Sequence, residues 1–345
     1  MKRGLLLAAA LVGLAGCGAP PAPAPHPELG ILTGADAGAT SGFDLRRIPG
    51  GESVASLPAG QGAFALSGGG DIAEGYLARS VGGTFEVDAV RPDRGFALRQ
   101  VATLDGEPTA AVLVRAEVTN FVGLPNVLIL STGTGRLVGF QHGTQLWSGS
   151  TSGATQLRVV SGKAYSGDSN GWAPINAATG TVGPTVTSTS CQPGPIALLD
   201  GNPLLDCEGT LSGSLQRIPA GPAAATPVTA GTVLVYAGDE VWRAGRTSAQ
   251  RIATGVKATA AVVAAADSRT VYVPTAAGVE RLDVATGSHS LVVAGAGISS
   301  IGLSRDGNFL YVLAGGRLST YAAATGNRVG SFSTDRTNLY LVAGG

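Results

Sequence analysis

Charged and aromatic residues are both scarce in this chain. Asp, Glu, Lys and Arg make up 13% of its 345 residues, against about a quarter in an average protein, and aromatic residues make up 5%. Basic and acidic residues balance at 23 each, so the formal net charge is zero. A neutral chain lacks the broad basic surface that nucleic-acid binding requires. The scarcity of charge does not indicate disorder, because 44% of the residues are hydrophobic, enough to build a packed core.

Long apolar runs are also missing, since none reaches the roughly 18 residues that cross a bilayer. The one notable run, Gly4 to Leu14, follows the basic pair Lys2-Arg3 and precedes Ala15-Gly16-Cys17. A basic start, a short apolar stretch and small residues form the layout of a secretory signal peptide. The sequence therefore predicts export from the cytoplasm.

The tetrapeptide Leu14-Ala15-Gly16-Cys17 resembles the lipobox of bacterial lipoproteins. The resemblance implies removal of residues 1–16 and attachment of acyl chains, such as palmitate, to Cys17. Several acyl chains anchor a protein stably at a membrane. Gly18 follows the cysteine, without the Asp that would indicate retention at the inner membrane. The alternative is an ordinary signal peptide with a chance cysteine.

Residues 17–29 form a Pro- and Ala-rich linker after the expected lipid site. Alternating proline disfavours helix and interior strand and favours an extended polyproline conformation. About ten residues at about 3.1 Å each would hold the domain that follows, residues 30–345, roughly 30 Å from the lipid.

The other two cysteines, Cys191 and Cys207, form an even pair in a chain expected to be exported, which favours a disulfide. The closed loop of about 15 residues would contribute roughly 3 kcal/mol by the chain-entropy estimate. A zinc site would need more ligands than His26, His142 and His289, which are scattered in the sequence. We therefore predict neither a metal site nor a cofactor.

From residue 30 onward no convincing helical period is present. Short runs rich in Val, Leu, Ile, Tyr and Thr are interrupted by Gly, Asp, Asn and Pro every 8–12 residues or so, which is typical of a sandwich, barrel or propeller.

An internal repeat separates these folds. Residues 267–287 and 305–326 share the order turn, strand, glycine turn, strand and Ala-Thr-Gly turn. An apolar strand at 298–303 precedes the second unit, and strands at 288–293 and 327–332 follow the two Ala-Thr-Gly turns. Four strands in roughly 40 residues correspond to one propeller blade. Weaker copies lie at 126–147, 171–180 and 232–243, whereas the first hundred residues show no clean repeat.

The segment 262–332 resembles YVTN-type β-propeller repeats, through Ser304-Arg305-Asp306-Gly307, Leu310-Tyr311-Val312 and Ala324-Thr325-Gly326. Its Ala-Thr-Gly turns are also similar to those of quinoprotein-type repeats, but the Trp usual a few residues later is missing at 181–186 and 288–293. The resemblance implies an all-β propeller. At about 40–45 residues per blade the domain has seven or eight blades, and we favour seven. The terminal strand 338–342 is expected to close the blade that the N-terminal segment begins. The rival fold is a stack of sandwiches.

Few residues offer chemistry, and each has a structural interpretation that we favour. Gly167 to Gly171 matches G-x-S-x-G, but a strand edge rather than a helix follows, so we read a polar turn in place of a nucleophile elbow. We read His142 and His289 as solvated turn residues. The three tryptophans, Trp147, Trp172 and Trp242, are expected in strands as packing residues.

These observations favour a non-catalytic lipoprotein of the cell envelope, held to a membrane through Cys17, whose propeller binds an unidentified envelope protein. One alternative is a propeller that binds a small ligand or glycan. The other is an exported enzyme of the lactonase-like or quinone-dependent kind, with ligands at the mouth of the central channel.

Overall fold

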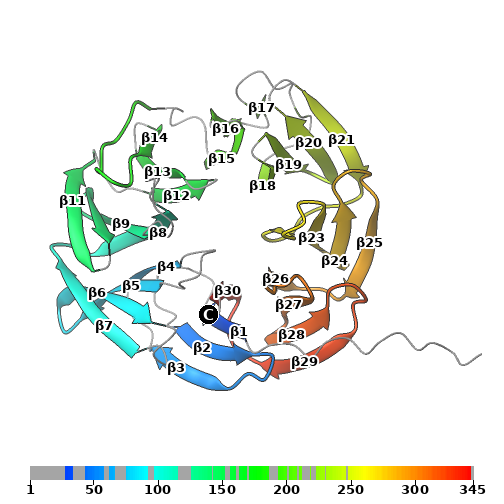
Figure 1. The fold of residues 1–345 in the computed structure, drawn as a ribbon, viewed down its shortest axis with the longest axis horizontal. Helices are drawn as coiled ribbons and strands as arrows, with labels where there is room; N and C mark the ends of the chain where they lie inside the picture. The colour runs from blue at the N-terminus through cyan, green and yellow to red at the C-terminus, as the bar shows by residue number, and fades with distance from the viewer. Residues whose placement is uncertain are drawn as a thin grey trace, which may run out of the picture.

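The fold is an all-β propeller, described here from a computed structural model (Figure 1). The structure describes residues 28–33, 43–57, 62–66, 75–91, 97–115, 126–141, 143–151, 156–160, 163–168, 171–185, 193–199, 202–207, 210–211, 218, 223–229, 231–245 and 248–342. Every regular element within these ranges is a strand. They include no helix long and apolar enough to cross a membrane.

The described strands pair into eight antiparallel sheets arranged around a common axis (Figure 1). The first four sheets contain β1 (Glu28–Thr33), β2 (Phe43–Ile48) and β3 (Ser53–Leu57); β4 (Gly62–Leu66), β5 (Gly75–Val81), β6 (Thr84–Arg91) and β7 (Ala97–Leu104); β8 (Pro108–Arg115), β9 (Asn126–Thr132), β10 (Arg136–Gln141) and β11 (Thr144–Ser150); and β12 (Gln156–Val160), β13 (Lys163–Asp168) and β14 (Gly171–Ile175).

The second half of the ring continues the pattern. Its four sheets contain β15 (Pro193–Leu199), β16 (Asn202–Cys207) and β17 (Thr210–Leu211); β18 (Ala223–Thr229), β19 (Thr232–Ala237), β20 (Glu240–Gly245) and β21 (Ala249–Thr254); β22 (Val263–Ala264), β23 (Thr270–Thr275), β24 (Gly278–Asp283) and β25 (His289–Ala294); and β26 (Ile298–Leu303), β27 (Phe309–Ala314), β28 (Arg317–Ala322) and β29 (Arg328–Ser333).

The preference for seven blades is wrong, because the described strands make eight sheets. The cause lies in the first hundred residues. They carry no Ala-Thr-Gly repeat, yet they supply nearly all of β4–β7 and three strands of another sheet. The length of one repeat is also close to the lower limit of the range, about 40–45 residues, that we assumed for a blade.

The ring closes where its two ends meet. The last strand, β30 (Asn338–Val342), pairs antiparallel with β1, and the order of that sheet is β3-β2-β1-β30. The C-terminal segment thus supplies the strand nearest the axis and the N-terminal segment supplies the outer three (Figure 1). This confirms the closing strand predicted at 338–342. β1 begins at Glu28, two positions before the expected domain boundary.

The core is divided into layers between neighbouring sheets. Tyr272 and Val279 of one sheet pack against Leu310 and Val312 of the next, for example, and Leu32 and Leu339 of the closing sheet pack against Tyr311. Burying one such side chain contributes about 1.5–3 kcal/mol. Because each sheet is covered on both faces by its neighbours, an inner strand can be buried throughout: all six residues of β23 are buried.

An ion pair also supports the closure. The Arg336 guanidinium, in the connection between β29 and β30, donates from Nε to the Asp44 carboxylate of β2 at 3.3 Å, and Ser56 of β3 donates to the same carboxylate at 2.7 Å. Burial alone would raise the pKa of Asp44, but the bonds from Ser56 and Arg336 and the charges of Arg336 and Arg46 outweigh it and lower the pKa.

We expect Arg336→Gln to lower the free energy of unfolding at pH 7 and to lose this effect in acid. A carboxylate with a depressed native pKa stabilises the fold above its unfolded pKa of about 3.9, and the contribution disappears as the pH falls through the native value. Urea unfolding of both proteins between pH 7 and pH 2 measures the difference. In an Asp44→Asn background the Arg336→Gln effect should be much smaller and nearly independent of pH. A constant difference across the whole pH range would show that Arg336 acts through other contacts.

Candidate functional site

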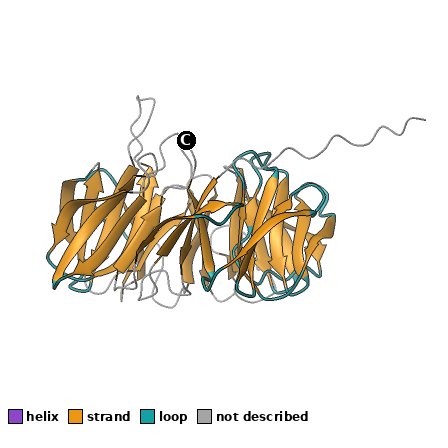
Figure 2. Ribbon diagram, turned by 90° about the horizontal axis from the view of Figure 1, so that it is seen from below, coloured by secondary structure: helices purple, strands orange, loops and turns teal. Residues whose placement is uncertain are grey.

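The two faces of the ring carry different turns (Figure 2). The turn between the first and second strands of a sheet meets the turn between its third and fourth strands: Val284 N–H donates to the Arg269 carbonyl at 2.7 Å, and Ala323 N–H to the Asn308 carbonyl at 2.8 Å. The start of β1 lies on this same face, because the Glu28 carboxylate accepts a bond from Arg305 N–H at 3.1 Å. We call it the linker face, since the predicted linker ends there.

A recurring turn organises the linker face. In the Ala-Thr-Gly turns at 176–181, 283–288 and 322–327, the N–H of the first residue bonds to the carbonyl of the sixth, and the N–H of the glycine bonds to the carbonyl of the first. The segment 47–52 makes the same two bonds, at 2.9 and 2.7 Å, although its sequence is Arg-Ile-Pro-Gly-Gly-Glu. The recurring turn is therefore also present in the N-terminal region, although the residues there do not show the Ala-Thr-Gly motif.

Each recurring turn packs on the outermost strand of the preceding sheet. A Cβ placed on the turn glycine would overlap or closely approach a residue of that strand. The glycines and their neighbours are Gly51 with Phe332, Gly180 with Trp147, Gly287 with Ile252, and Gly326 with Val292. The Ala-Thr-Gly motif is thus a contact between blades, and this explains its recurrence without any ligand.

Side chains also connect these turns to the preceding sheet. Trp147 of β11 donates from Nε1 to the Ala177 carbonyl at 2.8 Å, and Tyr272 of β23 donates from its hydroxyl to the Ala323 carbonyl at 3.4 Å. Burial raises the pKa of Tyr272, so its hydroxyl keeps its proton and remains a donor.

We expect Trp147→Phe to lower the free energy of unfolding by about 1 kcal/mol. The substitution keeps a ring beside Gly180 but leaves the Ala177 carbonyl without its donor. Trp242→Phe is the matched control: Trp242 Nε1 donates to the carboxylate of Glu240, which Arg251 also binds, so the carboxylate keeps a partner and the loss should be smaller. Urea denaturation of the three proteins measures both effects. Equal losses would show that the bond from Trp147 to the Ala177 carbonyl stabilises the fold no more than the bond from Trp242 to Glu240 does.

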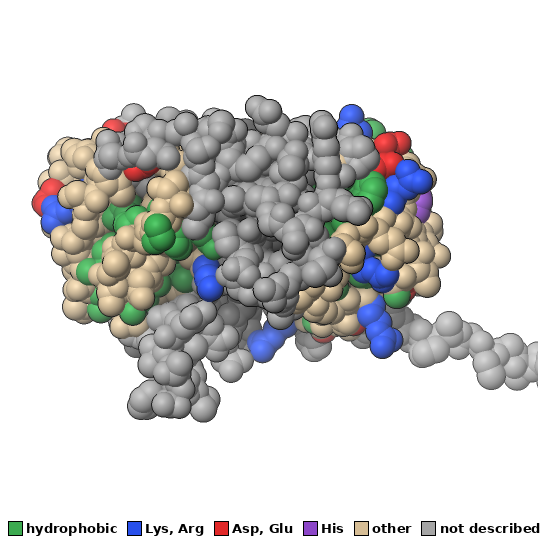
Figure 3. Space-filling model, turned by 90° about the horizontal axis from the view of Figure 1, so that it is seen from above, with side chains coloured by type: hydrophobic (Ala, Val, Ile, Leu, Met, Phe, Trp, Pro, Cys, Tyr) green, Lys and Arg blue, Asp and Glu red, His purple; other side chains and the backbone are tan. Residues whose placement is uncertain are grey.

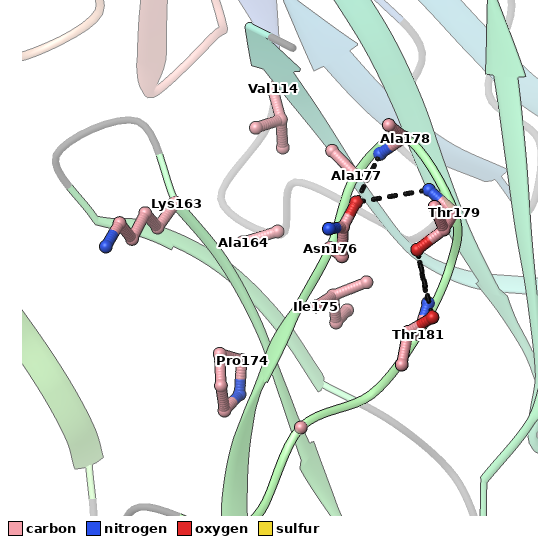
Figure 4. A pocket seen from close by; sticks show the side chains of 11 residues that line it. Val114, Lys163, Ala164, Pro174, Ile175, Asn176, Ala177, Ala178, Thr179 and Thr181 are labelled. Atoms are coloured by element: carbon pink, nitrogen blue, oxygen red, sulfur yellow. Dashed lines mark hydrogen bonds between the residues drawn. The ribbon is translucent and has the colours of Figure 1, made fainter. Parts of the chain in front are cut away.

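The larger of two described hollows on the linker face lies beside the turn at 176–181. It has a volume of about 540 Å³ and extends between Val114 of β8 and the residues of β13, β14 and the turn. Figure 4 shows Asn176 Oδ1 accepting bonds from the N–H groups of Ala178 and Thr179, and Thr179 Oγ1 accepting one from Thr181 N–H. Its walls are mostly small aliphatic side chains with threonine hydroxyls, and Lys163 is the charged residue among them.

A second hollow, of about 280 Å³, lies between the last two complete sheets and is more polar. Asp267, Arg281 and Asp306 line it. Both carboxylates accept bonds from their own turns: Asp267 from Arg269 N–H and Thr270 N–H, and Asp306 from the Ser304 hydroxyl and Asn308. These bonds are the largest factor that lowers the pKa of Asp267. The Ser-x-Asp-Gly motif therefore shapes a turn.

The candidate residues from the sequence are spread around the ring. Gly167 to Gly171 spans the β13–β14 hairpin, so a strand follows the turn, as expected for the polar-turn interpretation. His142 lies outside the described residues. His289 is exposed, as expected, but it begins β25 instead of lying in the turn, and its Nδ1 lies 2.6 Å from Glu280 Oε2. No local sequence pattern indicates this pairing, which depends on the register of β24 and β25.

All three tryptophans lie in strands, as predicted. Trp172 is fully buried in β14, and the guanidinium of Arg158 from β12 stacks over its ring at 5.3 Å. Burial lowers the pKa of Arg158.

The predicted lipid and disulfide sites fall largely outside the described residues. Cys17 and Cys191 are not among them. Cys207 ends β16, and its partner in the ladder is Pro193, two positions after Cys191. Among the residues that the structure describes, no three of His, Cys, Asp and Glu gather as a metal site would require.

Charge is dispersed on the side of the ring that Figure 3 shows, where described acidic and basic side chains stand in small groups of both signs. Typical pairs are Arg136 with Asp105 and Arg251 with Glu240. Such exposed pairs contribute little to stability.

Comparisons with known proteins identify the fold. No protein-family model matches the chain, and no curated protein matches its sequence. Among solved structures, AztD from Citrobacter koseri is similar over 93% of this chain and 99% of its own, with a TM-score of 0.62 and 13% identity. The dihydro-heme d1 dehydrogenase NirN, in complex with DHE, is similar over 92% of this chain and 75% of its own, with a TM-score of 0.61 and 11% identity.

A functionally unknown protein from Desulfotomaculum acetoxidans is similar over 91% of this chain and 98% of its own, with a TM-score of 0.53 and 13% identity. At these identities the likeness concerns the fold alone. Together with the eight described sheets, it identifies the chain as a β-propeller protein.

Proposed function

We propose that the chain is an extracytoplasmic lipoprotein, anchored in a membrane through Cys17, and that its propeller is a non-catalytic scaffold for a protein partner in the cell envelope. The sequence at 14–17 supports the anchor, because a lipobox-like tetrapeptide follows directly on the apolar run of a signal peptide. The first described strand starts about ten residues after Cys17, which suits a tethered domain.

The scaffold role is supported best by one observation, which is that acidic side chains on the linker face bind the backbone of their own turns. Asp267 and Asp306 occupy equivalent turns of neighbouring sheets, Asp283 begins the turn between β24 and β25, and each accepts bonds from backbone N–H groups of its own turn. These carboxylates hold loops in place for display, rather than reaching toward a shared centre. Rigid loops on a closed ring form the kind of preorganised surface that proteins bind.

Two experiments test the two halves of this proposal. Intact mass of the mature protein should show acyl additions and a start at Cys17, and Cys17→Ala should remove both. In envelopes, photo-cross-linking from the intact chain should yield one discrete protein adduct. The same cross-linker in a chain lacking residues 338–345, whose ring cannot close, is the control. An adduct that persists in the opened chain, or none in the intact one, would contradict a scaffold that works through its fold.

A second candidate function, small-ligand or glycan binding, is favoured by the hollow of about 540 Å³ beside Asn176, because ligand sites commonly fall between about 300 and 1,000 Å³. Thermal-shift measurements against sugars, divalent metals and peptidoglycan fragments test it. A ligand of this site should lose its effect in Ala178→Trp, which fills the hollow from an exposed turn position. Unchanged melting temperatures with every compound would reject this candidate.

A further inference from the structure

We infer that the linker holds the propeller with its linker face toward the membrane and its opposite face toward the surrounding compartment. This inference rests on the proposed lipidation of Cys17 and adds an orientation to it. It follows from where β1 begins, how far that point lies from the rim, and how short the linker is.

The point where the linker meets the ring is fixed. Glu28, the first residue of β1, accepts a bond from Arg305 N–H in the turn between β26 and β27. Burial raises the pKa of Tyr311 in β27, and the charge of the nearby Glu28 carboxylate adds to the rise. In the pairing of β1 with β30, the next residue, Leu29, lies opposite Val342. The strand β30 therefore ends on the same face. The linker therefore leaves from the linker face and not from the rim.

The distance that the linker would need to reach the opposite face decides the orientation. β1 is second from the axis in the closing sheet, with β2 and β3 outside it. Two strand spacings, about 10 Å, separate β1 from the rim, and a six-residue strand spans about 20 Å from face to face. A path around the rim to the opposite face thus needs roughly 30 Å.

This length equals the full extension of the linker. Residues 18–27 in a polyproline conformation reach roughly 30 Å. Turning the opposite face to the membrane would require the linker to lie fully extended along the protein surface. With the linker face toward the membrane, the whole length remains available for conformational freedom, so this orientation is favoured by entropy.

This orientation determines which face of the ring lies next to the bilayer and which face is open to the surrounding compartment. The two hollows on the linker face and the recurring turns face the gap between propeller and bilayer. The opposite face carries the turns between second and third strands, such as Ala276-Ala277 between β23 and β24. A protein partner of the linker-face loops would therefore be one that lies at the membrane surface.

A matched pair of cysteine variants tests the orientation. Ala285→Cys and Ala276→Cys lie in the two turns that flank β24, on the linker face and the opposite face, and both alanines are exposed. Each full-length lipidated protein is labelled with a donor dye and reconstituted into phosphatidylethanolamine–phosphatidylglycerol vesicles that carry a headgroup-linked acceptor. The unsubstituted protein gives the background from Cys191 and Cys207.

Energy transfer from position 285 is expected to be at least about twofold that from position 276, because roughly 20 Å of strand length separates the two turns. Equal or reversed transfer from proteins that float with the vesicles would overturn the orientation and leave the anchor intact. Protein that does not float, with an intact mass lacking acyl chains, would overturn the proposed anchor and the orientation together.

Discussion

Deleting residues 338–345 is expected to lower the melting temperature by roughly 10 °C or more and to broaden the unfolding transition. The deletion removes β30, the innermost strand of the closing sheet, and with it the backbone pairing of Leu29 to Thr33. It also removes Leu339, which packs with Tyr311 and Leu318 of the neighbouring sheet. A large buried side chain alone is worth about 2–5 kcal/mol in such a layer.

The control for this deletion is a chain that ends at Val342. It lacks residues 343–345 but keeps every pair of β30 with β1. Calorimetry of the three chains measures the effect, and the control should melt with the full-length protein. A synthetic peptide of residues 334–345, added to the shortened chain, should restore part of the lost stability. If the shortened chain melts as the intact one does, closure by β30 does not stabilise the ring.

The second large effect is expected at a turn glycine. Gly287 and Gly307 have the same φ of +73°, a conformation that costs an L-residue about 1–2 kcal/mol. Gly307 has open space around it, so Gly307→Ala should lose only that amount. At Gly287 the added methyl would overlap the carbonyl of Ile252 in the preceding sheet. Relieving the overlap must move two blades apart, and overpacking adds about 1–3 kcal/mol.

We therefore expect Gly287→Ala to lose roughly 2–5 kcal/mol of unfolding free energy, more than Gly307→Ala. Urea titration of the two variants compares them directly, since the substitution and the φ angle are the same. Equal losses would mean that the turn yields without moving the preceding sheet, and the proposed contact between blades would not be a stabilising one.

The strands in the second half of the ring were predicted closely from the sequence because the repeats there keep their turn motifs. The strand predicted at 298–303 matches β26, and the strands at 288–293 and 327–332 differ from β25 and β29 by one residue at each end. The Asp-Gly and Ala-Thr-Gly turns determine local backbone conformation, which sequence reports well.

The first half was harder because the recurring turn is defined by its backbone and not by its residues. Arg47 to Glu52 makes the same bonds as Ala322 to Asn327 with almost no shared sequence. Only the glycine at the fifth position is common to both, since a Cβ at this position would overlap the preceding blade. The pair of His289 with Glu280 depends on the register of two strands, and the pair of Arg336 with Asp44 depends on the two ends of the chain meeting. No local sequence pattern indicates either of them.

The shared closing sheet imposes an order on biosynthesis. β1 is among the first strands to be made, yet the neighbour that covers its inner edge, β30, is the last. Until the final residues emerge, β1 keeps an unpaired edge, and such edges recruit other chains. If the protein is exported as proposed, translocation must finish before the ring can shut. Periplasmic chaperones would then be needed most during this interval, and a stalled chain would be the form most prone to aggregate.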